Sequence, residues 1–307
     1  MKREKIVFLD KLQISEELID KLKKQADVVL PYSSWPKEKE VLELVKDATI
    51  IVSKWVYIGE KIFQNAKNLH YVVMAMTGYQ NWTDIKAARK YKVRVSNVPA
   101  FSSESVAEHA ILLMLSVSRQ LNLAQNTIKI GKFDPKGNAG EELKGKTLGI
   151  LGYGNIGRRV GKLARAFGMK TVYINSKSSQ SDLENLLRQS NVLSINIPLT
   201  PETEKLIGEK ELSLLPAGAI VVNTSRGKVV DEKALIKYLK NRHLYGAGLD
   251  VFEKEPPDKN NPLFSLSNVV VTPHIAWNTR QSQERLANGV TKNIESYLQG
   301  KPVNIVS

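Results

Sequence analysis

Three side chains with complementary chemistry each follow an apolar run in the second half of the chain. They are Arg226 after "AIVVNTS", Glu255 after "GLDVFEK" and His274 after "NVVVTP". A guanidinium binds a carboxylate and polarises a neighbouring carbonyl, and an imidazole donates a proton near neutral pH. A carboxylate bonded to the second ring nitrogen would fix the imidazole's orientation and favour its cationic form. These residue types predict a site that holds an acid and protonates a carbonyl oxygen.

A glycine-rich turn lies upstream of these residues, in "LGILGYGNIGRRV" at 148–160. Gly152, Gly154 and Gly157 have the spacing G-x-G-x-x-G between an apolar run and a helix-compatible stretch. The first glycine permits the tight turn, the second lets the backbone approach a pyrophosphate, and the third lets helix and strand pack closely. Free N–H groups and the helix dipole then favour phosphate groups. The turn therefore predicts a dinucleotide site.

The next apolar run, "KTVYIN", indicates which dinucleotide is preferred. An acidic residue about 20 positions after the glycines would hold the ribose 2′-hydroxyl of NAD. This chain has Asn175 there, followed by Ser176, Lys177 and Ser178. With no carboxylate to repel a 2′-phosphate, and with an ammonium and hydroxyls to receive it, we predict a preference for NADP(H). NAD(H), or use of both cofactors, is the alternative.

The site and the turn predict one chemistry when they are combined. Ligands of open α/β sheets bind beyond the carboxyl ends of the strands, so the three side chains can converge on one crevice. Hydride transfer to a 2-keto acid fits them: Arg226 grips the carboxylate, and His274 protonates the carbonyl oxygen as hydride arrives at C2. The cofactor carries the hydride, while the protein contributes position and the proton.

The elements that must position these residues form two series of short apolar runs separated by segments of helical length. The first series comprises residues 5–9, 26–30, 48–53, 69–76 and 93–98. The second begins at "TLGILG" and continues through "KTVYIN", "VLSINI", "AIVVNT", "YGAGLDVF" and "NVVVTPHI". Such alternation is typical of parallel strands covered on both faces. We predict an α/β protein with two doubly wound parallel-sheet domains.

Two stretches depart from this rhythm. Residues 103–130 are nearly continuous helix formers; Ser105 and Glu108 have capping-box spacing, and apolar residues surround most of the helix axis. We therefore expect a helix buried between domains or subunits. The segment from about 278 to 299 is also expected to be helical.

Length, composition and charge limit the classes of protein. The 307 residues suggest two domains, and 42% hydrophobic with 25% charged residues indicates a globular chain. Because there is no cysteine, disulfides, thiolate ligands and a cysteine nucleophile are excluded. The sequence shows neither a membrane-spanning run nor a signal peptide, so we expect a cytoplasmic protein. The net charge of +14 comes from dispersed lysines, which favours a solvated surface over a nucleic-acid site.

The segments "GYGNIG", "NTSRGKVVDEKAL", "GAGLDVFEKEPP" and "VTPHIAWNTR" resemble signatures of the D-isomer-specific 2-hydroxyacid dehydrogenases, and the similarity extends over nearly the whole chain. The resemblance implies that Arg226 binds the substrate, that Glu255 is the partner carboxylate and that His274 is the acid/base. It also implies that Asp250 contacts the nicotinamide carboxamide and that Val106 supports the nicotinamide ring.

The same resemblance implies a Rossmann nucleotide domain at 99–280, inserted into a flavodoxin-like substrate domain of residues 1–98 and 281–307. Subunits would pair through the nucleotide domain, with 103–130 as the crossing and dimerising element of a homodimer. Asn155 stands where the family often has arginine, so one phosphate contact is expected to be weaker. The remaining cofactor contacts implied are Ile156, Ser176, Lys177, Ile197, Pro198, Thr224 and Ala276.

Within the family, the chain looks most similar to glycerate dehydrogenases, also called hydroxypyruvate or glyoxylate reductases. The backbone at Thr77 and Gly78 would then bind the substrate carboxylate, with Lys54 facing the same cleft. Phosphoglycerate dehydrogenase is the rival because Lys54 could also meet a phosphate. Formate dehydrogenase is disfavoured, because by resemblance it has glutamine where Glu255 stands.

Two alternatives from other classes stay open at this point. Some members of the fold family are nucleotide-sensing corepressors, and this chain is basic, so a binding protein could keep all three catalytic residues. A metal-dependent dehydrogenase is disfavoured because the four histidines are spread along the chain without ligand spacing and there is no cysteine. We expect a small-molecule acid as partner, with neither membrane nor metal.

Overall fold

Two parallel sheets organise the chain, one in each of two units. The computed structural model describes residues 3–31, 33, 35–137 and 139–307. Unit 1 consists of Met1–Ser102 and Thr279–Ser307, and unit 2 consists of Ser103–Asn278.

The sheet of unit 1 has five strands within the described residues, all parallel, in the order β2-β1-β3-β4-β5. They are β1 Lys5–Phe8, β2 Asp27–Val29, β3 Ile50–Ser53, β4 Tyr71–Met74 and β5 Arg94–Asn97. Every residue of β3 and β4 is buried. Full burial explains why these runs are apolar without alternation, because strands of a parallel sheet are covered on both faces.

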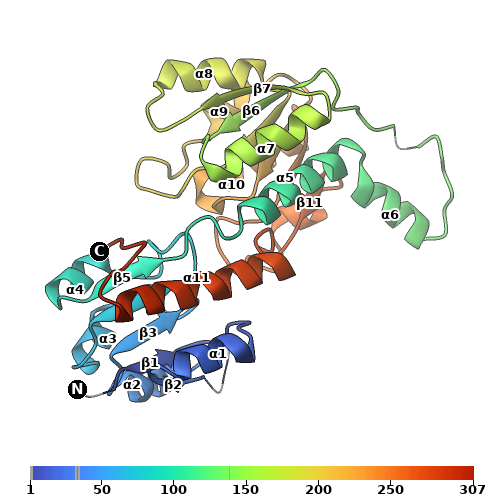
Figure 1. The fold of residues 1–307 in the computed structure, drawn as a ribbon. Coiled ribbons are helices and arrows are strands. Elements are labelled where there is room, and N and C mark those ends of the chain that lie inside the picture. The colour runs from blue at the N-terminus through green and yellow to red at the C-terminus, as the bar shows by residue number, and fades with distance from the viewer. Residues whose placement is uncertain (1–2, 32, 34, 138) are drawn as a thin grey trace. The chain divides into compact units, whose positions relative to one another are not determined.

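Helices on both sides of this sheet complete unit 1. They are α1 Glu16–Lys23, α2 Glu38–Val45, α3 Glu60–Asn65, α4 Ile85–Lys90 and α11 Arg280–Leu298. Helix α11 buries Leu286, Val290 and Ile294, a stripe with a spacing of four residues. It packs against α1 and β4, so the end of the chain returns to the sheet that the first residues form (Figure 1).

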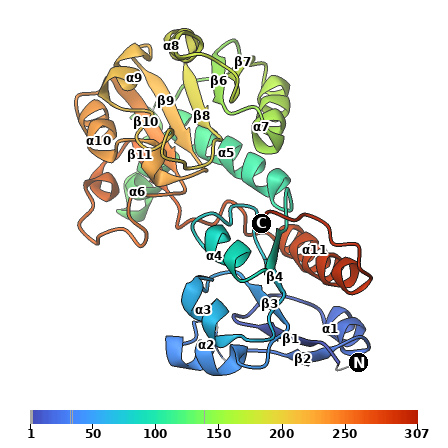
Figure 2. The ribbon, with the colours of Figure 1, turned by 90° about the vertical axis from the view of Figure 1, so that its left-hand side faces the viewer.

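The sheet of unit 2 has six parallel strands, all within described residues, in the order β11-β10-β9-β8-β6-β7 (Figure 2). They are β6 Thr147–Leu151, β7 Lys170–Ile174, β8 Val192–Ile195, β9 Ala219–Asn223, β10 Leu244–Leu249 and β11 Val269–Val271. Helices α5 Ser103–Ser118 and α7 Asn155–Ala166 pack on one face. The other face is covered by α8 Gln180–Gln189, α9 Glu209–Leu214 and α10 Glu232–Lys240. The predicted class, two doubly wound parallel-sheet domains, is confirmed.

The single helix expected over 103–130 is wrong. The segment forms α5 and a second helix, α6 Leu121–Lys129, separated by a turn in which Gln120 has a left-handed φ of 50°. The Gln120 side chain donates to Ala139 O and to the Tyr245 hydroxyl, contacts that sequence spacing does not reveal. Ser105 is the third residue of α5, so the predicted capping box is also wrong.

Burial likewise differs between the two helices. Most of α5 is buried, but none of the nine residues of α6, all of them described, is buried. The expectation of a helix that is buried all round is therefore wrong for α6, and α5 keeps an exposed stripe at Glu104, Glu108 and Leu112. Across the described residues, no helix is long and apolar enough to cross a membrane.

Candidate active site

The glycine turn between β6 and α7 has the geometry that each glycine predicts. Gly152 has φ +95°, and a Cβ there would lie 2.6 Å from Asn196 O. A Cβ on Gly157 would lie 2.0 Å from Gly152 O, so only glycine lets the helix pack this close. Gly154 is the N-cap of α7, and a Cβ built on it would meet no described atom within 4 Å. Two glycines are thus required by crowding, while the third leaves the backbone open to a ligand.

The start of α7 suits an anion. Its first turn reads Asn155-Ile156-Gly157-Arg158, without an acidic side chain. The N–H groups of this turn and the positive end of the helix dipole therefore meet no carboxylate from the turn itself. The residues present fit the pyrophosphate of a dinucleotide.

The loop after β7 is a polar turn closed by Asn175. Asn175 Oδ1 accepts from Lys177 N–H at 2.9 Å, and the Ser178 N–H donates to Asn175 O at 3.0 Å. Asn175, Ser176 and Lys177 are all exposed. An amide, a hydroxyl and an ammonium therefore lie beyond this strand end.

Arg226 lies three residues beyond β9, in a loop that is held by hydrogen bonds from its side chains to its backbone carbonyls. Asn223 Nδ2 donates to Arg226 O at 2.9 Å, and the Arg226 Nη1 donates to Ser225 O at 2.7 Å. A Cβ on the following Gly227 would lie 1.9 Å from Phe252 O, so this loop presses directly on the segment after β10. That segment carries Glu255.

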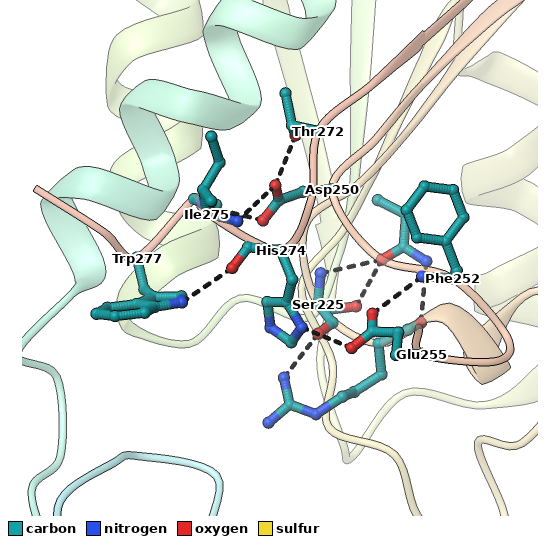
Figure 3. Close-up of polar contacts among 11 residues, drawn as sticks. Ser225, Asp250, Phe252, Glu255, Thr272, His274, Ile275 and Trp277 are labelled. Carbon is teal, nitrogen blue, oxygen red and sulfur yellow. Dashed lines mark hydrogen bonds and ion pairs between the residues drawn. The ribbon is translucent and has the colours of Figure 1, made fainter. Parts of the chain in front are cut away.

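His274 and Glu255 form a pair. The His274 Nδ1 lies 2.8 Å from Glu255 Oε2, and the Phe252 N–H donates to Glu255 Oε1 at 3.1 Å (Figure 3). Both carboxylate oxygens are therefore engaged, and Nε2 is the ring nitrogen that can exchange a proton with a substrate.

Electrostatics ties Arg226 to this pair. Burial raises the pKa of Glu255, but the hydrogen bond and charge of His274, the Phe252 N–H and the charge of Arg226 outweigh it, so the net pKa lies below its ordinary value. Burial lowers the pKa of Arg226, and the charge of Glu255 opposes that shift. A guanidinium stays protonated at neutral pH. The structure thus brings together an ionised carboxylate, an imidazole and a cationic guanidinium, as predicted from their positions after strands.

Comparison with known proteins identifies the family. Residues 111–276 match the family model described as D-isomer specific 2-hydroxyacid dehydrogenase, NAD binding domain. A glyoxylate reductase of Thermococcus litoralis is 39% identical over 88% of this chain and 85% of its own length. The chain belongs to the D-isomer specific 2-hydroxyacid dehydrogenase family. The predicted family is confirmed, and with it the class of NAD(P)-dependent oxidoreductases.

One further relative and one solved structure carry names with other substrates. The D-3-phosphoglycerate dehydrogenase of Archaeoglobus fulgidus is 37% identical over 94% of this chain, and the chain spans only 57% of that relative. A solved acyclic imino acid reductase, in complex with NADPH and D-Arg, superimposes with a TM-score of 0.90 at 32% identity and covers 99% of this chain and 100% of its own.

Other cofactor contacts predicted for the dehydrogenase also lie in unit 2. Ile197 and Pro198 follow β8, and a Cβ on Gly152 would come within 2.6 Å of Ile197 Cγ2. Thr224 follows β9 and is buried, as is Val106 on α5. Ala276 lies two residues after His274. Their contacts with a cofactor stay predictions.

Asp250 has a role that the sequence did not predict. It is fully buried and accepts from the Ile275 N–H at 2.9 Å, the Ala276 N–H at 2.8 Å and the Thr272 hydroxyl at 2.5 Å. The contact with a nicotinamide carboxamide, expected from the resemblance, stays a prediction. No spacing signal could reveal the backbone contacts, because the loop lies more than 20 residues further along the chain.

Of the four residues predicted to contact substrate, Arg226 lies in unit 2, and the other three lie in unit 1. Lys54 directly follows β3 and is 7% exposed; burial lowers its pKa to about 8, against the opposing charge of Asp10. Thr77 follows β4 and donates its hydroxyl to Val98 O at 3.1 Å, and Gly78 is half-buried. Their substrate contacts also stay predictions. Among the described residues no group of three histidine or carboxylate side chains is placed to hold a metal ion.

Proposed function

We propose that the protein reduces a small 2-keto acid to the D-2-hydroxy acid with NAD(P)H, reversibly, with glyoxylate and hydroxypyruvate as the first substrates to test. The observation that carries the proposal is the 2.8 Å pair of His274 and Glu255 beside the charge of Arg226. The family and the glyoxylate reductase relatives support the substrate class.

The glycine turn and the start of α7 would hold the pyrophosphate. The loop at Asn175–Lys177 would hold the adenosine ribose, and Val106, Asp250 and Ala276 would lie at the nicotinamide end. When bound, the nicotinamide supplies the hydride that reaches C2 of the keto acid. The fit rests on the open backbone at Gly154 and on the absence of an acidic residue from the first turn of α7, 155–158.

The chain's own residues would control charge and the proton. Arg226 binds the carboxylate of the keto acid and polarises its carbonyl. His274 donates the Nε2 proton to the carbonyl oxygen as the alkoxide develops, and Glu255, which stays ionised, stabilises the imidazolium beforehand. In the direction of oxidation, neutral His274 accepts the hydroxyl proton at the same atom. Acid/base groups of this kind contribute about 10²- to 10⁴-fold to rate.

We propose NADPH as the preferred cofactor because Asn175 and Lys177 offer a neutral and a cationic group where a carboxylate would repel a 2′-phosphate. Asn175→Asp tests this, because its Oδ1 can still accept from the Lys177 N–H and so keep the turn. We expect the ratio of kcat/KM for NADPH over NADH to fall at least tenfold. Asn175→Ala separates the new charge from loss of the amide; an unchanged ratio in Asn175→Asp would remove this residue from cofactor selection.

We propose a homodimer joined through α5, α6 and the segment that follows. In Figure 1, α6 and the chain after it extend away from the sheet of unit 2. Large apolar side chains are exposed there, up to 85% for Phe133: Leu112, Leu121, Ile128, Ile130 and Phe133. A second copy would cover them. Light scattering should give twice the chain mass, and Ile128→Lys with Phe133→Lys should give a monomer.

A panel of 2-keto acids, followed by the loss of NADPH absorbance, tests the function. We expect turnover of glyoxylate or hydroxypyruvate that His274→Gln abolishes. Turnover of 3-phosphohydroxypyruvate alone would favour the second candidate, a D-3-phosphoglycerate dehydrogenase, which the Archaeoglobus relative and the cationic Lys54 support. No turnover of any keto acid, with salt-sensitive retention on DNA, would favour a corepressor-like binding protein.

A further inference from the structure

His109 lies close to the loop that carries His274 but has no role in the chemistry above. It is on α5, and its side chain is 13% exposed. Its Nε2 lies 2.9 Å from Thr272 Oγ1 and 3.6 Å from Asp250 Oδ1. Thr272 is the residue directly after β11 and two residues before His274.

Proton counting gives the direction of each bond in this cluster. Asp250 accepts from two backbone N–H groups and from the Thr272 hydroxyl, so both of its carboxylate oxygens act as acceptors. Thr272 has a single hydroxyl proton, and Asp250 receives it. The contact between His109 and Thr272 therefore requires His109 to donate from Nε2.

The electrostatics of His109 agree with this arrangement. Burial lowers the pKa of His109, while the charge of Asp250 opposes the shift. At neutral pH the ring is thus uncharged and has one proton, which the contact with Thr272 places on Nε2. A chain of donors then runs from His109 to Thr272 and on to the Asp250 carboxylate.

This series of hydrogen bonds ends at the turn 272–276, whose backbone conformation positions the acid/base residue His274. His274 has a left-handed φ of 55°, a conformation that costs about 1 to 3 kcal/mol in a residue other than glycine. The turn is held by the His274 N–H, which donates to Asp250 O at 2.8 Å, and by the Trp277 indole, which donates to His274 O at 2.9 Å (Figure 3). The Asp250 carboxylate binds the next two N–H groups.

We propose that His109 and Thr272 are positioning residues, which hold the Asp250 carboxylate against the 272–276 turn and so keep His274 against Glu255. The inference rests on the acid/base role proposed for His274.

Thr272→Val, with Thr272→Ser as the matched control, tests the hydrogen bonds that run from His109 through Thr272 to Asp250. In Thr272→Val we expect kcat for the keto acid to fall about 10- to 50-fold, with the Kd for NADPH within twofold of wild type. We also expect the midpoint of the pH profile of kcat to move. Thr272→Ser keeps the hydroxyl and should stay within threefold of wild type with an unmoved profile. An unchanged kcat and pH profile in Thr272→Val would overturn the proposal.

A double-mutant cycle tests whether His109 acts through Thr272. The double variant His109→Phe/Thr272→Val should have a kcat only slightly below that of the less active single variant. Both substitutions break the same series of hydrogen bonds. Fully additive losses would contradict a shared path.

Two further measurements separate the possible failures. In wild type, ¹H–¹⁵N correlation spectra of the four histidine rings should show His109 as the Nε2–H tautomer; the Nδ1–H tautomer would overturn the proposal without any variant. If His274→Gln also leaves kcat unchanged, the proposed function fails. If His274→Gln is inactive while Thr272→Val matches wild type, only the positioning role fails.

Discussion

Both units hold a loop at the carboxyl edge of their sheet with a buried aspartate. In unit 1, Asp10 follows β1 and accepts from the N–H groups of Lys54 and Trp55, at 3.0 and 2.8 Å. In unit 2, Asp250 follows β10 and accepts from those of Ile275 and Ala276. Each carboxylate thus binds the loop after the neighbouring strand, β3 in one unit and β11 in the other.

The two loops differ in the side chain that they present. Lys54 is packed inside unit 1, with Nζ 5.2 Å from the centre of the Trp55 ring. His274 is 35% exposed and meets a second carboxylate, Glu255. In both units the buried aspartate therefore fixes the backbone of the neighbouring loop. Acid/base chemistry needs, in addition, an accessible titratable ring and a partner charge.

The largest expected effect distinguishes Arg226, the cation beside the His274 loop, from Lys54, the cation of the loop in unit 1. Arg226→Gln should lower kcat/KM for the keto acid about 10³-fold, because a charge aligned with the developing alkoxide is lost. Lys54→Met should lower it less than tenfold in the same assay. If both variants lost activity equally, the division of roles between the two edges would be wrong.

The two buried aspartates, Asp10 and Asp250, should contribute similar amounts to the free energy of unfolding. We expect Asp10→Asn and Asp250→Asn each to lower the free energy of unfolding by about 2 to 4 kcal/mol. The backbone N–H groups would lose a charged acceptor, and the NH₂ group of the new amide would face them as a second donor. Urea titration checks this. A loss of less than about 0.5 kcal/mol in one unit would show that the aspartate of that unit does not fix its loop as the other aspartate does.

Lys54 should destabilise unit 1. Its folded pKa of about 8 lies below the ordinary 10.5, so below pH 8 folding confines a charge that the unfolded chain would solvate. Lys54→Met should raise the free energy of unfolding by about 1 to 3 kcal/mol at pH 7. The gain should shrink between pH 8 and 10.5, as the folded state alone loses its proton. A loss of stability at pH 7 would contradict this reading.

Glu255 should give a smaller effect at the opposite end of the pH scale. Because its folded pKa is lowered, its ionised form stabilises the fold above about pH 4.5, and this contribution is lost as pH falls through the folded pKa. Glu255→Gln should cost about 1 kcal/mol or less at pH 7, since the side chain is 36% exposed. Denaturation at pH 7 and below pH 4 should show that the difference vanishes in acid.

The parts of the fold and site that were predictable leave local marks in the sequence. Strands covered on both faces are continuous apolar runs, as in β3 and β4. Backbone crowding permits only glycine at Gly152 and Gly157. Residues just after parallel strands share one edge of a sheet, which is why Arg226 and His274 could be grouped.

The parts that were missed depend on contacts between distant segments. Asp10 and Lys54 are 44 residues apart, and His109 and Thr272 are 163 apart, so no periodicity links them. The break between α5 and α6 at Gln120 likewise depends on Tyr245, 125 residues away. Helix-forming residues continue on both sides of that break, so the sequence gives no sign of it.

Single-turnover oxidation of NADPH by His274→Gln, with a keto acid that wild type reduces, tests the central claim most directly. The rate of the hydride step should fall at least 100-fold, while the Kd for NADPH measured by fluorescence stays within twofold of wild type. A hydride rate within threefold of wild type, or an equal loss of cofactor binding, would contradict the account.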